Sequence, residues 1–328
     1  MTVAVRPAPR GELTAALAEA LARDPGARLP DDAVAGRADP YGDDLQLALY
    51  LCYELHYRGL DGVDDTWEWD PGLLRLRHAL ERAFRSALRA DVPPGDDVDS
   101  ALGDLVTEPL DGHGVTHFLR DEGQLWQLRE YAAHRSLYQL KEADPHAWMI
   151  PRLTGAAKAA LATVEYEEFG AGRAERVHAT LFAALMRDLY LDDTYGHYLD
   201  AAPAPTLATV NLMSLLGLHR AARGALVGHF AVVESTSPPA SRRMIEALER
   251  LGGGAAAVHF YAEHVEADAV HEQLVRHEVV GGLLREEPRL AADVVFGIAA
   301  TLLLEERLGD HLLGAWRAGR SSLRVPLR

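Results

Sequence analysis

Apolar residues recur along most of this chain at the three- and four-residue spacing of a helix, and this pattern limits the fold more than any other feature. Residues 71–90 are a clear amphipathic case that begins at Pro71, a residue suited to the first helical turn. Apart from a possible short edge pair, no alternating run has useful strand length. We therefore predict a nearly all-α protein built as a helical bundle. The expected helices span about 43–60, 71–90, 101–108, 115–143, 151–165, 172–190, 205–219, 221–235, 239–251, 255–286 and 289–317.

Composition excludes several classes of protein. The 328 residues allow one large domain or two modest ones, and the formal charge of −16 argues against a nucleic-acid partner. The single cysteine, Cys52, rules out an intrachain disulfide, a thiolate zinc site and an iron–sulfur cluster. The N-terminus lacks the apolar stretch of a signal peptide, and the longest apolar run, 294–304, is too short to cross a membrane. We expect a cytoplasmic protein without a membrane partner.

One helical segment, HFYAEHVEADAVHE, carries two histidines and an aspartate on a single stripe. His264, Asp268 and His271 stand at i, i+4 and i+7, which places them within roughly 60° of one another around a helix. Glu266 and Gln273 on the far side favour water, so the stripe is expected to face the interior. Burying such groups without partners is costly. Either a metal ion bound by the three residues or a buried His–Asp pair beside a second histidine would compensate this cost.

Further acids and histidines lie where other helices would face the same interior. Glu234 ends an apolar run before the turn STSPP, where a glutamate opposes the helix dipole and either reaches solvent or needs a cation. Glu142 ends another helical pattern, before Asp144-Pro145. On that same helix, Glu130 and His134 are interpreted as a surface pair at i, i+4.

A third group of polar residues surrounds the segment EYEEFGAGRAERVH. Glu165, Glu167 and Glu168 precede His178, which begins an apolar face and can therefore point inward. The three acids are either ligands on an inward face or a solvated run of charge. Helical bundles build iron sites from glutamates and histidines on several facing helices, so these positions are candidates for one centre.

The chain resembles the haem-oxygenase-like diiron oxidases and oxygenases, in particular the group of iron-containing redox enzymes. The resemblance rests on HRSLYQLKEADPHAWMIPRLTG, EYEEFGAGRAERVHATLFAALM, LHRAARGALVGHFAVVESTSPP and FYAEHVEADAVHE, and it covers about residues 125–317. Residues 39–60 also look like the N-terminal part of longer members. The resemblance implies a haem-oxygenase-like helical bundle over 111–328, preceded by an N-terminal helical extension over 1–110. That extension either packs against the bundle or forms a homodimer.

Carried over to this chain, the resemblance implies seven metal ligands that bind two Fe²⁺ ions. They are Glu142, Glu168, His178, Glu234, His264, Asp268 and His271, of which Glu168, His264 and Asp268 are implied to be catalytic. Glu168 has the family-like spacing to His178, although the sequence does not fix which of Glu165, Glu167 and Glu168 binds metal. The implied reaction uses O₂ and an electron donor for N-oxygenation, desaturation or oxidative C–C cleavage of a small molecule of amino-acid or fatty-acid type.

Other functions remain as alternatives on the same scaffold, namely a metal-independent helical binding protein or a cofactor-free oxidase. A haem oxygenase would need a proximal histidine early in the chain, and a thiaminase-like enzyme would need a reactive cysteine, whereas Cys52 lies in the apolar run LALYLCY. Residues expected near the ligands are Tyr261, His229, Glu263 and Glu272. Candidates to bind a substrate carboxylate are Arg173 with Arg176, or Arg242 with Arg243.

Overall fold

The structure, a computed structural model, describes residues 3–107 and 112–327, without the side chains of 32–33 and 266–270. Helices dominate the described residues, in which the one pairing of extended backbone is an isolated bridge between Ala4 and Leu60. The prediction of an all-α fold is therefore confirmed. Within the described part of the chain, no helix is both long and apolar enough to cross a membrane.

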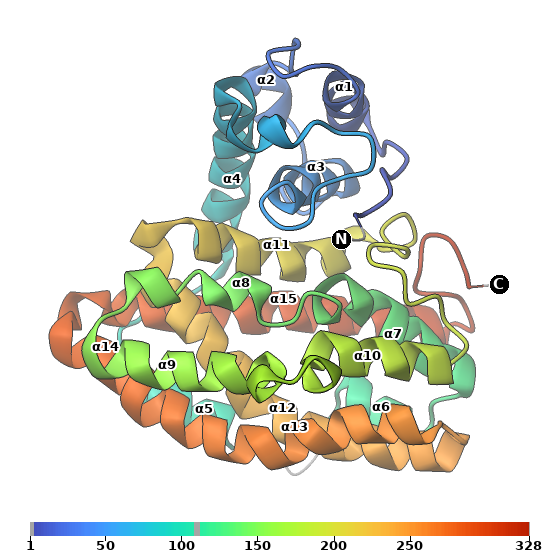
Figure 1. Ribbon diagram of the computed structural model, residues 1–328, viewed down its shortest axis with the longest axis vertical. Coiled ribbons are helices and arrows are strands. Elements are labelled where there is room, and N and C mark those ends of the chain that lie inside the picture. Colours follow the sequence, from blue (N-terminus) through green and yellow to red (C-terminus); the bar gives the residue numbers. More distant parts are fainter. Residues whose placement is uncertain (1–2, 108–111, 328) are drawn as a thin grey trace.

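The first four helices gather at one end of the molecule (Figure 1). They are α1 (Glu12–Leu21), α2 (Asp32–Ala35), α3 (Asp43–Glu54) and α4 (Pro71–Asp91). The helix α4 begins where the sequence predicts, because the Asp70 carboxylate accepts the backbone N–H of Leu73 and Pro71 occupies the first turn. The helix α3 packs against α1 and α4.

The remaining helices form the bundle (Figure 1). They are α5 (Val98–Leu105), α6 (Val115–Asp121), α7 (Leu125–Gln139), α8 (Asp144–Ala147), α9 (Gly155–Glu168), α10 (His178–Asp188), α11 (Ala204–Leu218), α12 (Arg223–Leu251), α13 (Ala255–Leu274), α14 (Gly281–Glu286) and α15 (Ala291–Arg317). A π-helical turn, η6 (Val275–Val280), joins α13 to α14. Short 3₁₀ turns are η1 (Asp65–Trp69), η2 (Ile150–Arg152), η3 (Gly170–Gly172), η4 (Ala174–Arg176), η5 (Arg220–Ala222) and η7 (Pro288–Leu290).

The helix α11 joins the N-terminal helices to the bundle. It is buried along almost its whole length, since α3 covers one side and α15 and α12 cover the other. The helix α5, by contrast, packs on α12 and α15 although it precedes residue 110. The predicted boundary between 110 and 111 itself falls in 108–111, outside the described residues.

The helix α12 packs against α13 on one side and α15 on another, and two glycines bring α12 and α15 close together. A Cβ at Gly297 would lie 1.9 Å from the carbonyl oxygen of Ala225, and one at Gly228 would lie 2.0 Å from that of Val294. Both distances are far below van der Waals contact, so any larger residue would force the two backbones apart. This close approach fixes the position of α12, which carries Glu234.

The predicted helix break around Pro238 is wrong. The helix α12 runs unbroken through Pro238 and Pro239. Prolines there remove the N–H donors that would reach the carbonyls of Glu234 and Ser235, but packing against α13 and α15 stabilises the helical path. Glu234 therefore lies inside a helix and is buried, so the expectation of a helix-terminal, dipole-opposing glutamate is also wrong.

Two other predicted helices have different bounds in the structure. The segment 115–143 is divided into α6 and α7 at Gly123, where a Cβ would lie 2.7 Å from the Cα of Leu119. The helix expected from 172 begins only at His178, because Gly172 has a φ of +82° that a right-handed helix cannot contain. His178 therefore lies in the first turn of α10.

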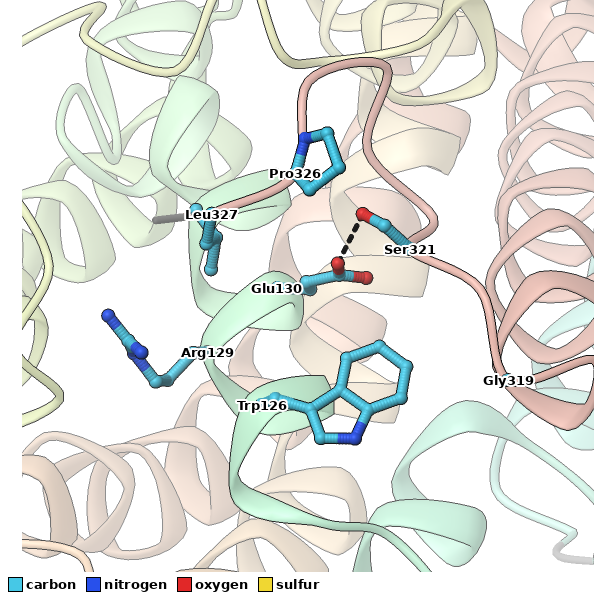
Figure 2. Close-up of a pocket in the computed structure, with 7 residues that line it drawn as sticks. All are labelled: Trp126, Arg129, Glu130, Gly319, Ser321, Pro326 and Leu327. Atoms are coloured by element: carbon cyan, nitrogen blue, oxygen red, sulfur yellow. Dashed lines mark hydrogen bonds between the residues drawn. The ribbon is translucent and has the colours of Figure 1, made fainter.

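The interpretation of Glu130 and His134 as a surface pair is wrong, because both side chains are buried. Glu130 faces the C-terminal segment across a small pocket of about 290 Å³ and accepts the hydroxyl of Ser321 (Figure 2). Its second oxygen accepts the indole N–H of Trp316 at 2.9 Å and the hydroxyl of Ser322 at 2.7 Å. These bonds attach the C-terminal segment to α7, so the role of Glu130 is structural.

Candidate metal centre

Six of the seven predicted ligands lie together in the core as two groups of three. Cluster A is Glu142, His178 and His264, and cluster B is Glu168, Glu234 and His271. Within each cluster the three ligand atoms lie within 4.8 Å of one another, and all six side chains are buried. The side chain of Asp268, the seventh, lies outside the described residues.

Four helices and one turn bring these side chains together. Glu168 ends α9, His178 begins α10, Glu234 lies in α12 and both remaining histidines lie on α13, whereas Glu142 occupies the turn between α7 and α8. The spacing of seven residues places His264 and His271 on one face of α13, as predicted, with exposed fractions of 6% and 1%.

Glu168 connects the two clusters. Its Oε2 lies 2.7 Å from Nδ1 of His178 in cluster A, and its Oε1 lies 3.7 Å from Nδ1 of His271 in cluster B. The rings of His178 and His264 stand 4.5 Å apart between centroids. A single carboxylate thus faces both clusters, an arrangement suited to bridging two neighbouring metal ions.

Partners outside the clusters orient two of the imidazoles. The Nδ1 of His264 lies 2.8 Å from the carbonyl oxygen of Phe260, to which it donates, so Nε2 faces Glu142 at 3.4 Å. The Nε2 of His271 donates to Glu167 at 2.6 Å, so Nδ1 faces cluster B. Such bonds fix the ring orientation of metal-binding histidines and raise their basicity.

The charge balance of the centre calls for a cation. Burial raises the energy of every carboxylate here, and the Glu142 Oε2 is buried without a hydrogen bond. Burial lowers the pKa of His271, but its contacts with Glu234 and Glu167 outweigh this and raise the pKa to about 9. His271 therefore carries a proton that a metal ion would replace. Three carboxylates and three imidazoles are a donor set that suits iron.

The structure distinguishes the surroundings of the three neighbouring acids, which the sequence alone could not do. Glu168 belongs to cluster B, whereas Glu167 is half exposed and reaches His271 from outside. Glu165 is buried, and neither of its oxygens has a hydrogen-bond partner. Burial, followed by the charges of Glu168 and Glu234, raises the pKa of Glu165 to about 9. In the iron-free protein at neutral pH, Glu165 is therefore a neutral carboxylic acid.

We expect Glu165→Gln to reduce the pH dependence of stability in the iron-free protein. A pKa that rises from 4.5 to about 9 on folding lets the unfolded chain ionise first, so stability is full below pH 4.5 and falls as the pH rises toward 9. The slope is about 1.4 kcal/mol per pH unit. Urea unfolding in chelator at pH 6 and pH 8 should show a larger loss in the native protein than in the variant, because the variant keeps the contribution of other groups such as His271, whose pKa folding also raises. Equal slopes for the two would contradict a neutral Glu165.

A cavity of about 560 Å³ opens onto the centre. Glu142, Glu168, Glu234 and His264 form part of its wall, while residues of α6 and of the C-terminal half of α15 line another part. Its volume is in the range of small-molecule sites. The two clusters therefore lie beside a space that can admit an organic molecule.

Several polar residues of the cavity wall were not predicted from the sequence. The Arg135 guanidinium forms two parallel bonds to Glu305, at 2.9 and 2.7 Å. His146 lies 3.2 Å from His229, measured between their Nε2 atoms, and the Nδ1 of His229 bonds to Thr301 at 2.9 Å. His229 was expected near the ligands, but no signal in the sequence distinguishes its partner, because the two histidines are 83 residues apart.

Of the other residues that the sequence suggested, some line the cavity and some do not. Tyr261 and Arg243 line the cavity, where the Nε of Arg243 donates to Thr116 at 2.9 Å. Glu263 instead pairs with Arg176 near the surface at 3.2 Å. The remaining candidates, Glu272, Arg173 and Arg242, are not part of the cavity wall.

Comparisons with known proteins identify the family of this chain. Residues 129–306 match the model of a family described as iron-containing redox enzymes, and this region contains all six cluster residues. The match covers more than half of the chain, so the protein belongs to that family. Among individual proteins, it is similar to a nitrosourea synthase of Streptomyces achromogenes subsp. streptozoticus, with 25% identity over 244 residues. The aligned region covers 72% of this chain and 52% of the synthase, so the chain spans about half the length of that relative.

Proposed function

We propose that the protein is a non-haem diiron oxidase or oxygenase that uses O₂ to oxidise a small organic molecule. The observation that carries this proposal is the pair of buried clusters linked by Glu168 beside a cavity. Six donors with one carboxylate between them suit two metal ions better than one. Two Fe²⁺ ions would supply the electrons that reduce O₂, with an external electron donor restoring them after each turnover.

The chain's own residues would orient the metal ligands and the substrate. The carbonyl of Phe260 and the carboxylate of Glu167 hold His264 and His271 in place. Phe182 and Phe230 contribute apolar surface to the cavity, which limits water near the clusters. The cavity volume favours a substrate of amino-acid or fatty-acid size.

The printed function of the relative bears on which reaction to test first. The name nitrosourea synthase indicates a product with an N-nitroso group, and forming such a group requires oxidation at nitrogen. This favours N-oxygenation over desaturation or C–C cleavage as the reaction to test for this chain. Because the alignment covers only 52% of that relative, substrate screening should include amines and amino acids together with fatty acids.

The test is anaerobic titration of the iron-free protein with Fe²⁺, followed by rapid mixing with O₂ while visible absorbance is recorded. We expect about two irons per chain, as a six-donor centre implies, and a transient absorption band after O₂ is added. Absence of iron uptake and of any O₂ reaction would contradict the proposal. It would then favour a cofactor-free oxidase or a metal-independent binding protein.

Single substitutions on α13 should remove one iron each. His264→Ala deletes a donor of cluster A and His271→Ala one of cluster B, so each variant should bind about one iron per chain while keeping its helical content. The measurement is iron per chain after anaerobic loading and desalting, with circular dichroism for the fold. Glu263→Ala is the matched control, because it is on the same helix but pairs with Arg176 near the surface. Retention of two irons by both histidine variants would argue against the ligand assignment.

A further inference from the structure

Glu142 is the one cluster residue that occupies a turn between helices, and the backbone of that turn is strained. The helix α7 ends at Gln139 and α8 begins at Asp144. Between them, Ala143 has a φ of +71°, which a residue with a Cβ rarely adopts. Such a conformation persists only where the surrounding structure holds it. The position of the Glu142 carboxylate therefore depends on contacts made by its neighbours.

The residue just before Glu142 is fixed by the N-terminal helices. The Lys141 ammonium lies 2.9 Å from Oε2 of Glu54, at the end of α3, and the two side chains are 1% and 0% exposed. The hydroxyl of Tyr195 donates to the other Glu54 oxygen at 2.6 Å. The ammonium also stands 4.2 Å from the ring centroid of Tyr57. A buried charge pair with this many partners has little freedom to move.

A second contact from the same segment holds the backbone. The Arg58 guanidinium, four residues beyond Glu54, donates to the carbonyl oxygen of Leu140 at 2.7 Å. Carbonyls at a helix C-terminus lack partners within the helix, and this bond supplies one for α7. Residues Glu54–Arg58 therefore hold both the backbone and a side chain immediately before Glu142, whose own carboxylate faces His264 in the bundle.

We propose that Glu54 and Lys141 are positioning residues for the Glu142 carboxylate, so that the N-terminal helices determine the geometry of cluster A. This inference rests on the proposed iron centre. It assigns residues 43–58 a role at the centre, because without them the turn at 140–144 would relax and move one donor of cluster A. Cluster B has no donor on this turn and should be unaffected.

The test removes both charges together, since deleting one would leave the other buried and unpaired. In Glu54→Gln with Lys141→Met, iron affinity at cluster A should fall by about tenfold or more, the range seen when groups that orient a ligand are lost. Cluster B should keep its iron. Anaerobic equilibrium dialysis against Fe²⁺ should show one site of native affinity and one weakened site. Combined with His271→Ala, the double substitution should weaken or abolish the single remaining site.

A matched control is Glu81→Gln. Glu81 is also buried in the N-terminal helices and contacts Tyr53 and His219, but not the turn at 140–144. This variant should keep two sites of native affinity, which separates positioning from general destabilisation. If the double variant does not fold, Arg58→Met is tested in its place. The Arg58 side chain is only partly buried, and this substitution removes its hydrogen bond to the Leu140 carbonyl.

The inference would be overturned if the double variant bound iron at both sites with native affinity. The same result in Arg58→Met would overturn it if the double variant failed to fold. Equal weakening of both sites would also overturn it, since the contact concerns cluster A alone. Failure of the unmodified protein to bind iron at all would remove the proposed function and this inference with it. That result is distinct, because it is seen before any substitution is made.

Discussion

Replacing Glu168 with alanine is expected to lower iron binding at both clusters, the largest loss from any single substitution in the centre. Its two oxygens face different clusters, at 2.7 Å from His178 and 3.7 Å from His271. Without this carboxylate, cluster B loses a donor and cluster A loses the group that faces it across the centre. Iron retained after anaerobic loading and desalting should fall from about two per chain to below about one, because metal affinity depends on the full ligand set.

The fold should survive this substitution. Removing Glu168 breaks its pair with His178, but it also removes one of the charges that oppose the ionisation of Glu165, so the two effects on the iron-free state offset each other in part. The helical circular dichroism of the variant should equal that of the native protein. Glu263→Ala again serves as the control, with two irons expected. If the Glu168 variant keeps two irons of native affinity, the carboxylate does not connect the clusters, and the two sites are independent or absent.

Helix periodicity predicted the architecture well where local signals and packing agree. At α4, the Asp70 cap and Pro71 mark the start both in sequence and in structure. At α12, local signals and packing disagree. The pair Pro238-Pro239 locally favours a helix end, but α12 continues through both prolines, packed against α13 and α15. The sequence pattern contains no information about those neighbours, so the error arises from tertiary contacts that override propensity.

The sequence marks an inward helix face at His264 and His271, whereas the complete set of candidate ligands was implied by the family resemblance. The acids at 165 and 168 show the limit of this approach. Residues three apart share one face of a helix, and both Glu165 and Glu168 are buried. Only the approach of α10 and α13 distinguishes them, by placing His178 and His271 next to Glu168. The placement of Asp268 stays a prediction.

The cavity wall could not be predicted, because it is made by residues far apart in the chain. Arg135 and Glu305 pair across 170 positions, and the turn holding Glu142 is contacted by Glu54 and Arg58. Such pairings leave no periodic signal in a single sequence. The substrate therefore has to be found by experiment, with the cavity limiting its size.

Removal of iron should lower the stability of the protein by several kcal/mol. In the iron-free state the carboxylates of both clusters are buried near one another, and burial together with the charges of Glu168 and Glu234 raises the pKa of the neighbouring Glu165 to about 9. A ligand that binds only the folded state stabilises it by about 2.7 kcal/mol when present at a hundred times its dissociation constant, so two sites would contribute about 5 kcal/mol. This corresponds to a rise in Tm of about 7 °C for a chain of this size.

Anaerobic thermal unfolding with Fe²⁺ and with a chelator measures this difference. The native protein and Glu263→Ala should show the full shift, and His264→Ala about half of it, because one cluster remains. Glu168→Ala should show little or none. A shift of the same size in Glu168→Ala would mean that the metal stabilises the fold from a different place, since the only group removed is the carboxylate between the two clusters. Equal shifts in all four proteins would therefore contradict both the ligand assignment and the connection between clusters A and B.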